Sequence, residues 1–143
     1  MAQTPAYRTE AEIEEVVRRF EDCSYTPEEF VHARHLTVAA VYFSRFEGPT
    51  AKERMRAGLR KFIAHHGKQG YHETITEFWM KRVERTVQTH TLTEKGPDLL
   101  ALVNAVIGSC RDKNAIYEYY SRELLGTPEA KAAWVEPDIQ PIG

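Results

Sequence analysis

The feature of this sequence that most constrains its fold is an apolar period of 3.6 residues, which recurs along nearly the whole chain. In the first such segment, from Thr9 to Asp22, the apolar residues on one helical face are Ile13, Val16, Val17 and Phe20. The alternating pattern typical of strands is nearly absent. The sequence therefore predicts an all-α protein.

Start and stop signals divide this pattern into helices. Thr26 can act as an N-cap, Pro27 suits the first helical position, and Glu29 lies three residues after the cap, as in a capping box. These signals predict a second helix from Pro27 to Phe46, which the segment Glu47 to Pro49 ends.

The same signals place the remaining helices. Thr50 as a cap predicts a third helix from Ala51, which Gly67 and Gly70 break. The later predicted helices lie over about Tyr71 to Gln88, Asp98 to Gly108, Asp112 to Gly126 and Thr127 to Trp134. Short connections favour mostly antiparallel neighbours. We expect one domain over residues 1–143, a bundle of about six or seven helices with irregular tails at 1–8 and 136–143.

The composition excludes several classes of protein. A chain of 143 residues with a net charge of −2 suits one globular domain and gives no general attraction to nucleic acid or to an anionic membrane. No run approaches the roughly 18 apolar residues of a membrane span, and no signal peptide is recognisable. Cys23 and Cys110 read as a reduced pair. We expect a cytoplasmic protein without nucleic-acid or membrane partners, and no feature fixes its oligomeric state.

Two histidines fall on the face of the second helix that should be buried. His32 and His35 lie one turn apart near the middle of that face, and Ala39, one turn further on, leaves room beside them. Burying two imidazoles costs free energy unless their nitrogens find partners.

A third histidine belongs to the fourth helix. A helical projection places His72, Thr76 and Trp79 on its inward face, and Glu77 and Lys81 toward solvent. If that helix begins a residue or two later, however, residues 71–73 lie in the loop before it and the projection does not apply to them.

Three converging imidazoles predict a metal site. Neutral imidazole binds zinc, iron, copper and nickel, and three protein ligands with one open position are typical of a catalytic centre. His32, His35 and His72 are the candidate metal ligands. The candidate catalytic residues are Glu73 and Tyr71, with Glu73 as an acid/base or as an acceptor for an imidazole N–H.

Thr76 and Trp79 are the candidate contacts to a small-molecule substrate. Thr76 stands where the metalloprotease pattern H-E-x-x-H requires its second histidine, so that class is excluded. The remaining reactions, hydrolysis, isomerisation and oxygen-dependent chemistry, are not distinguished.

The alternative interpretation needs no metal. A histidine on an apolar face is more often a hydrogen-bonded core residue, and a carboxylate such as Glu73 is favoured in the first turn of any helix by the helix dipole. Tyr71 and Trp79 are likewise more often packing residues. The chain would then be a non-enzymatic helical module that binds a ligand or a partner protein.

Three segments carry a resemblance to a known family. They are H-x-x-H-L-x-x-A from His32 to Ala39, YHETIT from Tyr71 to Thr76, and W-x-E-P-D from Trp134 to Asp138. With these segments the chain resembles a family of small bacterial all-helical proteins without an assigned activity. The resemblance extends from Phe20 onward and implies that the histidines and YHETIT act as one unit, but it implies no substrate.

Overall fold

The structure, a computed structural model, describes residues 6–68, 70–93 and 98–142 and confirms the all-α fold. Its helices are α1 (Glu10–Glu21), α2 (His32–Arg45), α3 (Gly48–His65), α4 (Glu73–Thr93), α5 (Leu99–Ser109), α6 (Arg122–Leu125) and α7 (Pro128–Ala132), with a 3-10 helix η1 (Ala115–Glu118) between α5 and α6. The described ranges contain no strand.

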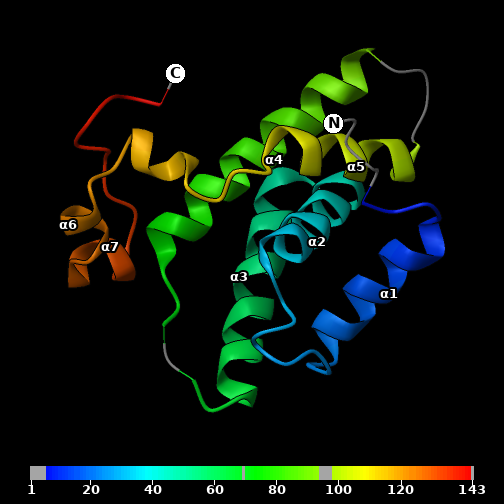
Figure 1. Cartoon of the computed structure of the whole chain (residues 1–143), viewed down its shortest axis with the longest axis horizontal. Helices are drawn as coiled ribbons and strands as arrows, with labels where there is room; N and C mark the ends of the chain where they lie inside the picture. The colour runs from blue at the N-terminus through cyan, green and yellow to red at the C-terminus, as the bar shows by residue number, and fades with distance from the viewer. Residues whose placement is uncertain (1–5, 69, 94–97, 143) are drawn as a thin grey trace.

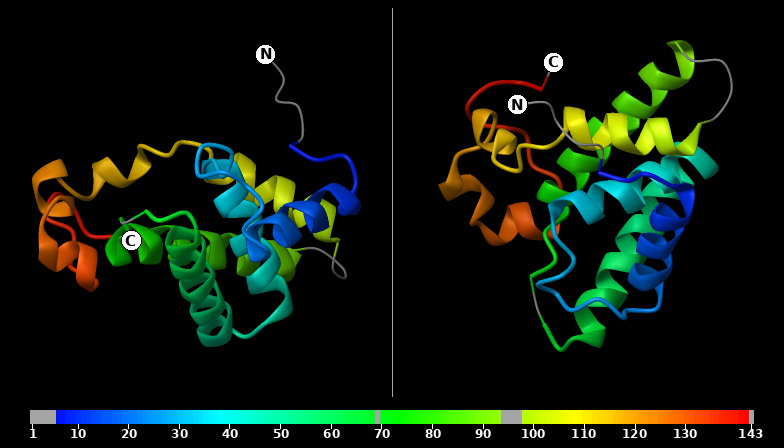
Figure 2. Two further views of the ribbon diagram at one scale, coloured as in Figure 1. Left: turned by 90° about the horizontal axis from the view of Figure 1, so that it is seen from below. Right: turned by 45° about the vertical axis from the view of Figure 1, so that its right-hand side comes forward.

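Helix α2 is the centre of the molecule. Helices α1, α3, α4 and α5 all pack against it (Figure 1). The short helices α6 and α7 lie to one side, next to the beginning of α4 (Figures 1 and 2). Each part has its own apolar core, the smaller one built around Phe78 and Tyr120, and Trp79 packs against both.

The apolar period of 3.6 residues correctly predicted α1. Thr9 is its N-cap, the Glu12 N–H donates to the Thr9 hydroxyl, and the Glu12 carboxylate accepts from the Thr9 N–H. This capping box leaves the predicted face free to enter the core, and Ile13 and Phe20 are almost completely buried.

The predicted start of α2 at Pro27 is wrong. Thr26 and Glu29 do form the reciprocal hydrogen bonds of a capping box, but they close a single turn, and the helix begins at His32. Between them Phe30 turns into the core, where its ring centroid lies 4.8 Å from that of Phe20 and 5.1 Å from that of Phe62. Packing of Phe30, rather than the local signal, sets the start of α2.

Helix α3 begins earlier than predicted, at Gly48, so Thr50 lies inside the helix and Glu47 is its N-cap. The predicted end is correct. Gly67 has a φ of 64°, which suits glycine, and the Lys68 N–H donates to the Ile63 carbonyl to close the terminus.

The predicted single helix over 112–126 is wrong, because it is broken between η1 and α6. Ser121 is the N-cap of α6: its hydroxyl accepts from the Leu124 N–H and donates to Asp138. This contact ties the break to the C-terminal segment, which no local pattern could show.

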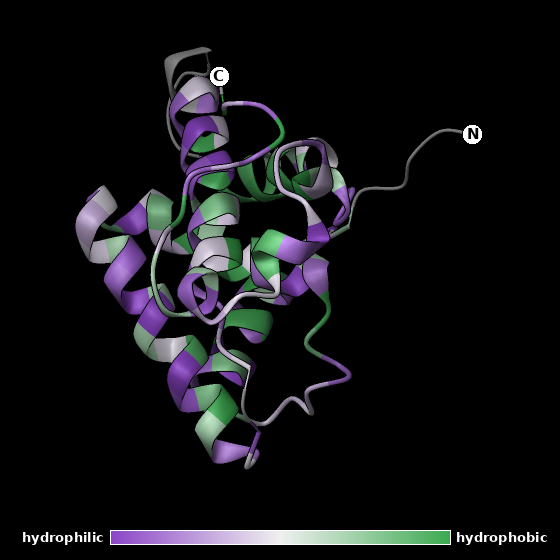
Figure 3. Cartoon of the chain, turned by 90° about the vertical axis from the view of Figure 1, so that its left-hand side faces the viewer, coloured by the Kyte–Doolittle hydropathy of each residue, from purple (hydrophilic) through white to green (hydrophobic). Residues whose placement is uncertain are grey.

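Hydrophilic and hydrophobic residues alternate along the helices instead of forming long uniform stretches (Figure 3). Accordingly, none of the helices searched in the described ranges combines the length and the apolar character needed to cross a membrane.

Candidate functional site

A pocket of about 410 Å³ lies between α2, α3 and α4. Every candidate site residue from the sequence except Glu73 lines it, namely His32, His35, Tyr71, His72, Thr76 and Trp79. The rest of its wall is largely apolar, with Leu36, Ala39, Met55, Leu59, Ile63, Ile75, Met80 and Val83. The predicted residues are thus brought together, around a mostly apolar space.

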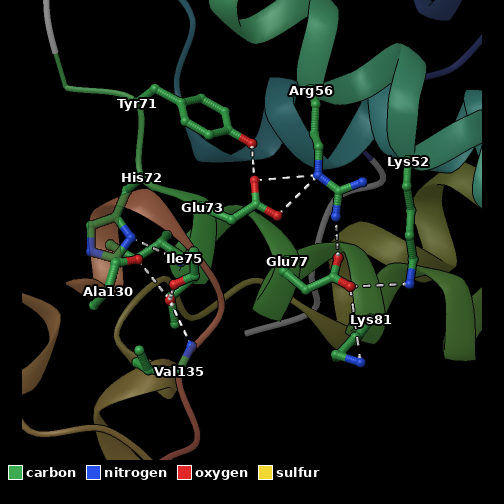
Figure 4. A network of polar contacts seen from close by, with 12 residues as sticks. Lys52, Arg56, Tyr71, His72, Glu73, Ile75, Glu77, Lys81, Ala130 and Val135 are labelled. Atoms are coloured by element: carbon green, nitrogen blue, oxygen red, sulfur yellow. Dashed lines mark hydrogen bonds and ion pairs between the residues drawn. The ribbon is translucent and has the colours of Figure 1, made fainter. Parts of the chain in front are cut away.

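His72 is held differently from the prediction. Helix α4 begins at Glu73, so His72 precedes it and the helical projection does not apply. Its Nδ1 accepts from the Ile75 N–H at 3.1 Å, which caps the helix (Figure 4). Its Nε2 donates to the Leu125 carbonyl at 2.7 Å. Both ring nitrogens are therefore occupied, and the ring joins α4 to the end of α6.

His32 and His35 each use one ring nitrogen. His32 Nε2 donates to the Cys110 carbonyl at 2.9 Å, and His35 Nδ1 donates to the Val31 carbonyl at 3.1 Å. Nδ1 of His32 and Nε2 of His35 make no hydrogen bond to another described residue, and an imidazole that carries one proton has a lone pair on its second nitrogen.

Both of these rings also pack against aromatic side chains. The centroid of the His32 ring lies 4.6 Å from that of Trp79, and the centroid of the His35 ring lies 4.0 Å from that of Phe30. Burial lowers the pKa of His35 to about 4, so this ring is neutral near pH 7.

The donor set does not suit a three-histidine metal centre. A nitrogen that accepts or donates a hydrogen bond cannot at the same time bind a metal, and His72 has no nitrogen left. In the part of the chain that the structure describes, no group of three His, Cys, Asp or Glu residues is placed to hold a metal ion. His32 and His35 are the two predicted ligands that keep a lone pair.

Glu73 points away from the histidines. Its carboxylate pairs with Arg56 at 3.0 Å and accepts from the Tyr71 hydroxyl, and its side chain is only 14% exposed (Figure 4). Burial and the hydrogen bond to Glu73 raise the pKa of Tyr71 to about 12. These contacts join α4 to α3, and the catalytic roles of Glu73 and Tyr71 stay predictions.

Glu77 does not face solvent as predicted. Its side chain is 13% exposed, because it pairs with Lys52 at 3.2 Å and with Arg56 at 3.4 Å, whereas Lys81 is largely exposed. Glu73 and Glu77, four residues apart, thus receive the basic side chains of α3 (Figure 4). The sequence signal that could have found this ion-pair network is the complementary charge on the two helices.

The C-terminal segment is tied to the same end of α4. The buried Thr74 hydroxyl lies 2.7 Å from the Ala130 carbonyl and 2.9 Å from the Ala133 carbonyl, and it accepts from the Val135 N–H. Further on, the Asp138 carboxylate accepts from the N–H and the hydroxyl of Ser121. The W-x-E-P-D segment therefore braces α6 and α7, and it does not line the pocket.

Scans against protein-family models, curated proteins and solved structures each found no match to this chain. The family resemblance of the three segments therefore stays an expectation from the sequence.

Proposed function

We propose that this chain binds a small, mostly apolar organic molecule in the pocket between α2, α3 and α4. The observation that carries the proposal is the pocket itself. Its volume of about 410 Å³ lies in the range of small-molecule sites, which are typically about 300–1,000 Å³, and its wall is apolar apart from a few polar groups.

The polar groups of this wall suit the orientation of a ligand. His35 offers Nε2 as an acceptor, since its Nδ1–H is already bonded to the Val31 carbonyl. The Thr76 hydroxyl is a second polar group, and no hydrogen bond joins it to another described residue. A ligand that brings a hydroxyl or an N–H to this wall finds a partner there.

Binding without catalysis is the function that these contacts favour. The two groups predicted to move protons, Glu73 and Tyr71, are bonded to each other, and Glu73 is also paired with Arg56. Their positions join α3 to α4 rather than face a bound molecule.

Fluorescence of a single tryptophan tests the proposal. Trp79 lines the pocket and Trp134 does not, so a Trp134→Phe protein reports on the pocket alone. We expect saturable changes in this signal with neutral apolar probes such as 1-decanol or N-phenyl-1-naphthylamine.

A filling variant supplies the control. Ala39→Phe introduces a large ring into the pocket and should weaken binding at least tenfold, whereas Ala57→Phe, on the exposed side of α3, should leave it unchanged. Equal binding by the two variants would place the probe elsewhere and contradict the proposal.

The metal-dependent enzyme predicted from the sequence is a second candidate. The observation in its favour is that His32 and His35 each donate one N–H to a backbone carbonyl and keep the other nitrogen, as metal-bound histidines usually do. Elemental analysis of the untagged protein beside a His32→Ala, His35→Ala variant tests it. About one metal per chain, lost in the variant, would support this candidate, and no metal after aerobic and anaerobic reconstitution would oppose it.

We also propose a cytoplasmic location. Cys23 and Cys110 are both buried and unpaired, which suits a reducing compartment. Recovery of the protein from an exported fraction of its native cells would contradict this location.

A further inference from the structure

A second pocket, of about 470 Å³, adjoins the first. His32, Leu36 and Lys113 line both spaces, so the two pockets are neighbours that share one side. The second pocket opens beside the start of α2 and the loop that follows α5, and exposed Val31 forms part of it.

This shared side carries positive charge. Among the residues that the structure describes, Lys113 is the one Lys or Arg side chain on the wall of the first pocket, and Arg111 joins it in the second. Both residues are exposed, and neither forms an ion pair with another residue in the ranges 6–68, 70–93 and 98–142. The Asp112 carboxylate between them accepts from the Asn114 N–H and lines neither pocket.

His32 occupies a hydrogen-bond acceptor, a backbone carbonyl, close to these two basic residues. The carbonyl of Cys110, at the end of α5, accepts from His32 Nε2. The carbonyl end of a helix repels an anion, so a hydrogen bond that occupies this oxygen favours negative charge nearby.

From these observations, and resting on the proposed function, we propose that the ligand is an amphipathic anion. Its apolar body lies in the first pocket, and its single terminal oxyanion group, a carboxylate or a phosphate monoester, lies between Lys113 and Arg111. Lysine attracts such a group as a point charge, and arginine donates two parallel hydrogen bonds to it.

The size of the first pocket limits the body. At about 410 Å³ the pocket lies toward the lower end of the roughly 300–1,000 Å³ of small-molecule sites. A small body of about ten carbons, with its head group left outside the first pocket, is therefore a suitable probe.

Calorimetric titration of the full chain tests the inference with four ten-carbon probes at monomeric concentrations. We expect decanoate or monodecyl phosphate to bind at least tenfold more tightly than 1-decanol, and decylamine to bind most weakly. The tighter of the two anions identifies the head group. Added salt should reduce the preference for the anion, because the two basic side chains are exposed.

Variants assign this preference to residues. Lys113→Met should remove most of the difference in affinity between the anion and the alcohol, and Arg111→Met should reduce that difference. Lys131→Met, an exposed lysine on α7 that lines neither pocket, is the matched control. Circular dichroism of each variant establishes that its helices are intact.

The outcomes separate the two proposals. If 1-decanol binds as tightly as both anions, and Lys113→Met changes nothing, the anion inference is wrong and the apolar pocket stands. If no ten-carbon probe binds, both proposals fail. Tighter binding of decylamine than of the anions would also overturn the inference.

Discussion

The two histidine-bearing walls of the pocket use their polar atoms in opposite ways. At the start of α4, both imidazole nitrogens of His72 form hydrogen bonds within the protein, and the Tyr71 hydroxyl is hydrogen-bonded to the Glu73 carboxylate. At the start of α2, one ring nitrogen of His32 and one of His35 donate to backbone carbonyls, and the second nitrogen of each ring has no such partner among the described residues.

This difference distinguishes polar groups that hold the helices together from polar groups that remain available to a ligand. The segment YHETIT has the more noticeable sequence, yet its side chains join α4 to α3 through Arg56 and to α6 through the Leu125 carbonyl. A helix start always leaves backbone N–H groups to be satisfied, and His72 serves that need. The α2 pair is simpler in sequence and is the wall on which a ligand finds free lone pairs.

The largest expected effect is a dependence of stability on pH through His35. The pKa of His35 is about 4 in the folded chain, against 6.5 for an ordinary histidine. As the pH falls, the unfolded chain therefore binds a proton at a higher pH than the folded chain does. The contribution of His35 to stability is complete above about pH 6.5 and is lost as the pH falls toward 4, by on the order of 3 kcal/mol in total.

A His35→Gln variant isolates this contribution. Between pH 4.5 and 7.5, urea unfolding should give a steeper rise of the free energy of unfolding with pH for the wild-type chain than for the variant. Parallel profiles would mean that His35 has the same pKa in the folded and the unfolded chain, and that its wall of the pocket is wetter than the structure indicates.

The next largest effect compares two buried threonines, one near each wall. Thr74→Val removes the hydroxyl that holds the Ala130 and Ala133 carbonyls and the Val135 N–H, and should cost about 2–3 kcal/mol because those groups lie in another element. Thr37→Val on α2 removes a bond to the Ala33 carbonyl of its own helix and one to the Tyr7 hydroxyl, and should cost about 1 kcal/mol.

Urea unfolding of both variants, followed by Trp134 fluorescence, measures the difference. Equal costs would show that the C-terminal elements are held by apolar packing and that the Thr74 contacts add little. Valine has nearly the shape of threonine, so the comparison is not confused by a new cavity.

The sequence predicted what local patterns decide. The period of 3.6 residues is enough for the fold class, and it placed the start of α1 within one residue of the observed start. It failed where distant packing competes with a local signal. Thr26 and Glu29 form their box, but Phe30 gains more by stacking in the core than by continuing a helix.

For the site, too, the sequence predicted the features that one helix decides and missed the partners that lie far away in the sequence. The helical face of α2 correctly indicated that His32 and His35 lie on the same side of the helix, where both line the pocket. His72 also lines the pocket, but as an N-cap, and its second partner is a carbonyl 53 residues away in the sequence. No spacing rule reveals such a partner. The side chains of Glu73 and Tyr71, for which catalytic roles are predicted, join α4 to α3 in the structure.

A smaller effect separates the two bonds of His72. His72→Ala loses both the cap and the bond to Leu125 and should lower the free energy of unfolding by about 2 kcal/mol. His72→Asn can cap the helix through its side-chain oxygen and should recover about 1 kcal/mol of this loss.

Probe binding completes that comparison. If His72 is structural, the asparagine variant should bind 1-decanol within about threefold of the wild-type chain, whereas Ala39→Phe should not bind it. If His72→Asn recovers stability but loses binding of 1-decanol, His72 contacts the ligand. The α4 wall would then bind the ligand as the α2 wall does, and the proposed difference between the two walls would be wrong.

The smallest expected effect lies furthest from the pocket. Ser121→Ala removes the cap of α6 and its bond to Asp138, and should cost about 1 kcal/mol in thermal or urea unfolding. The Leu125 carbonyl accepts from His72, and Leu125 belongs to the smaller apolar core, against which Ile75 and Trp79 pack, so a loosened α6 reaches the pocket only indirectly. We therefore expect affinity for the ten-carbon probes to change by less than twofold. A larger loss of affinity at this distance would mean that α6 and the C-terminal segment hold the α4 wall in place for the ligand, and that the two walls are coupled rather than merely different.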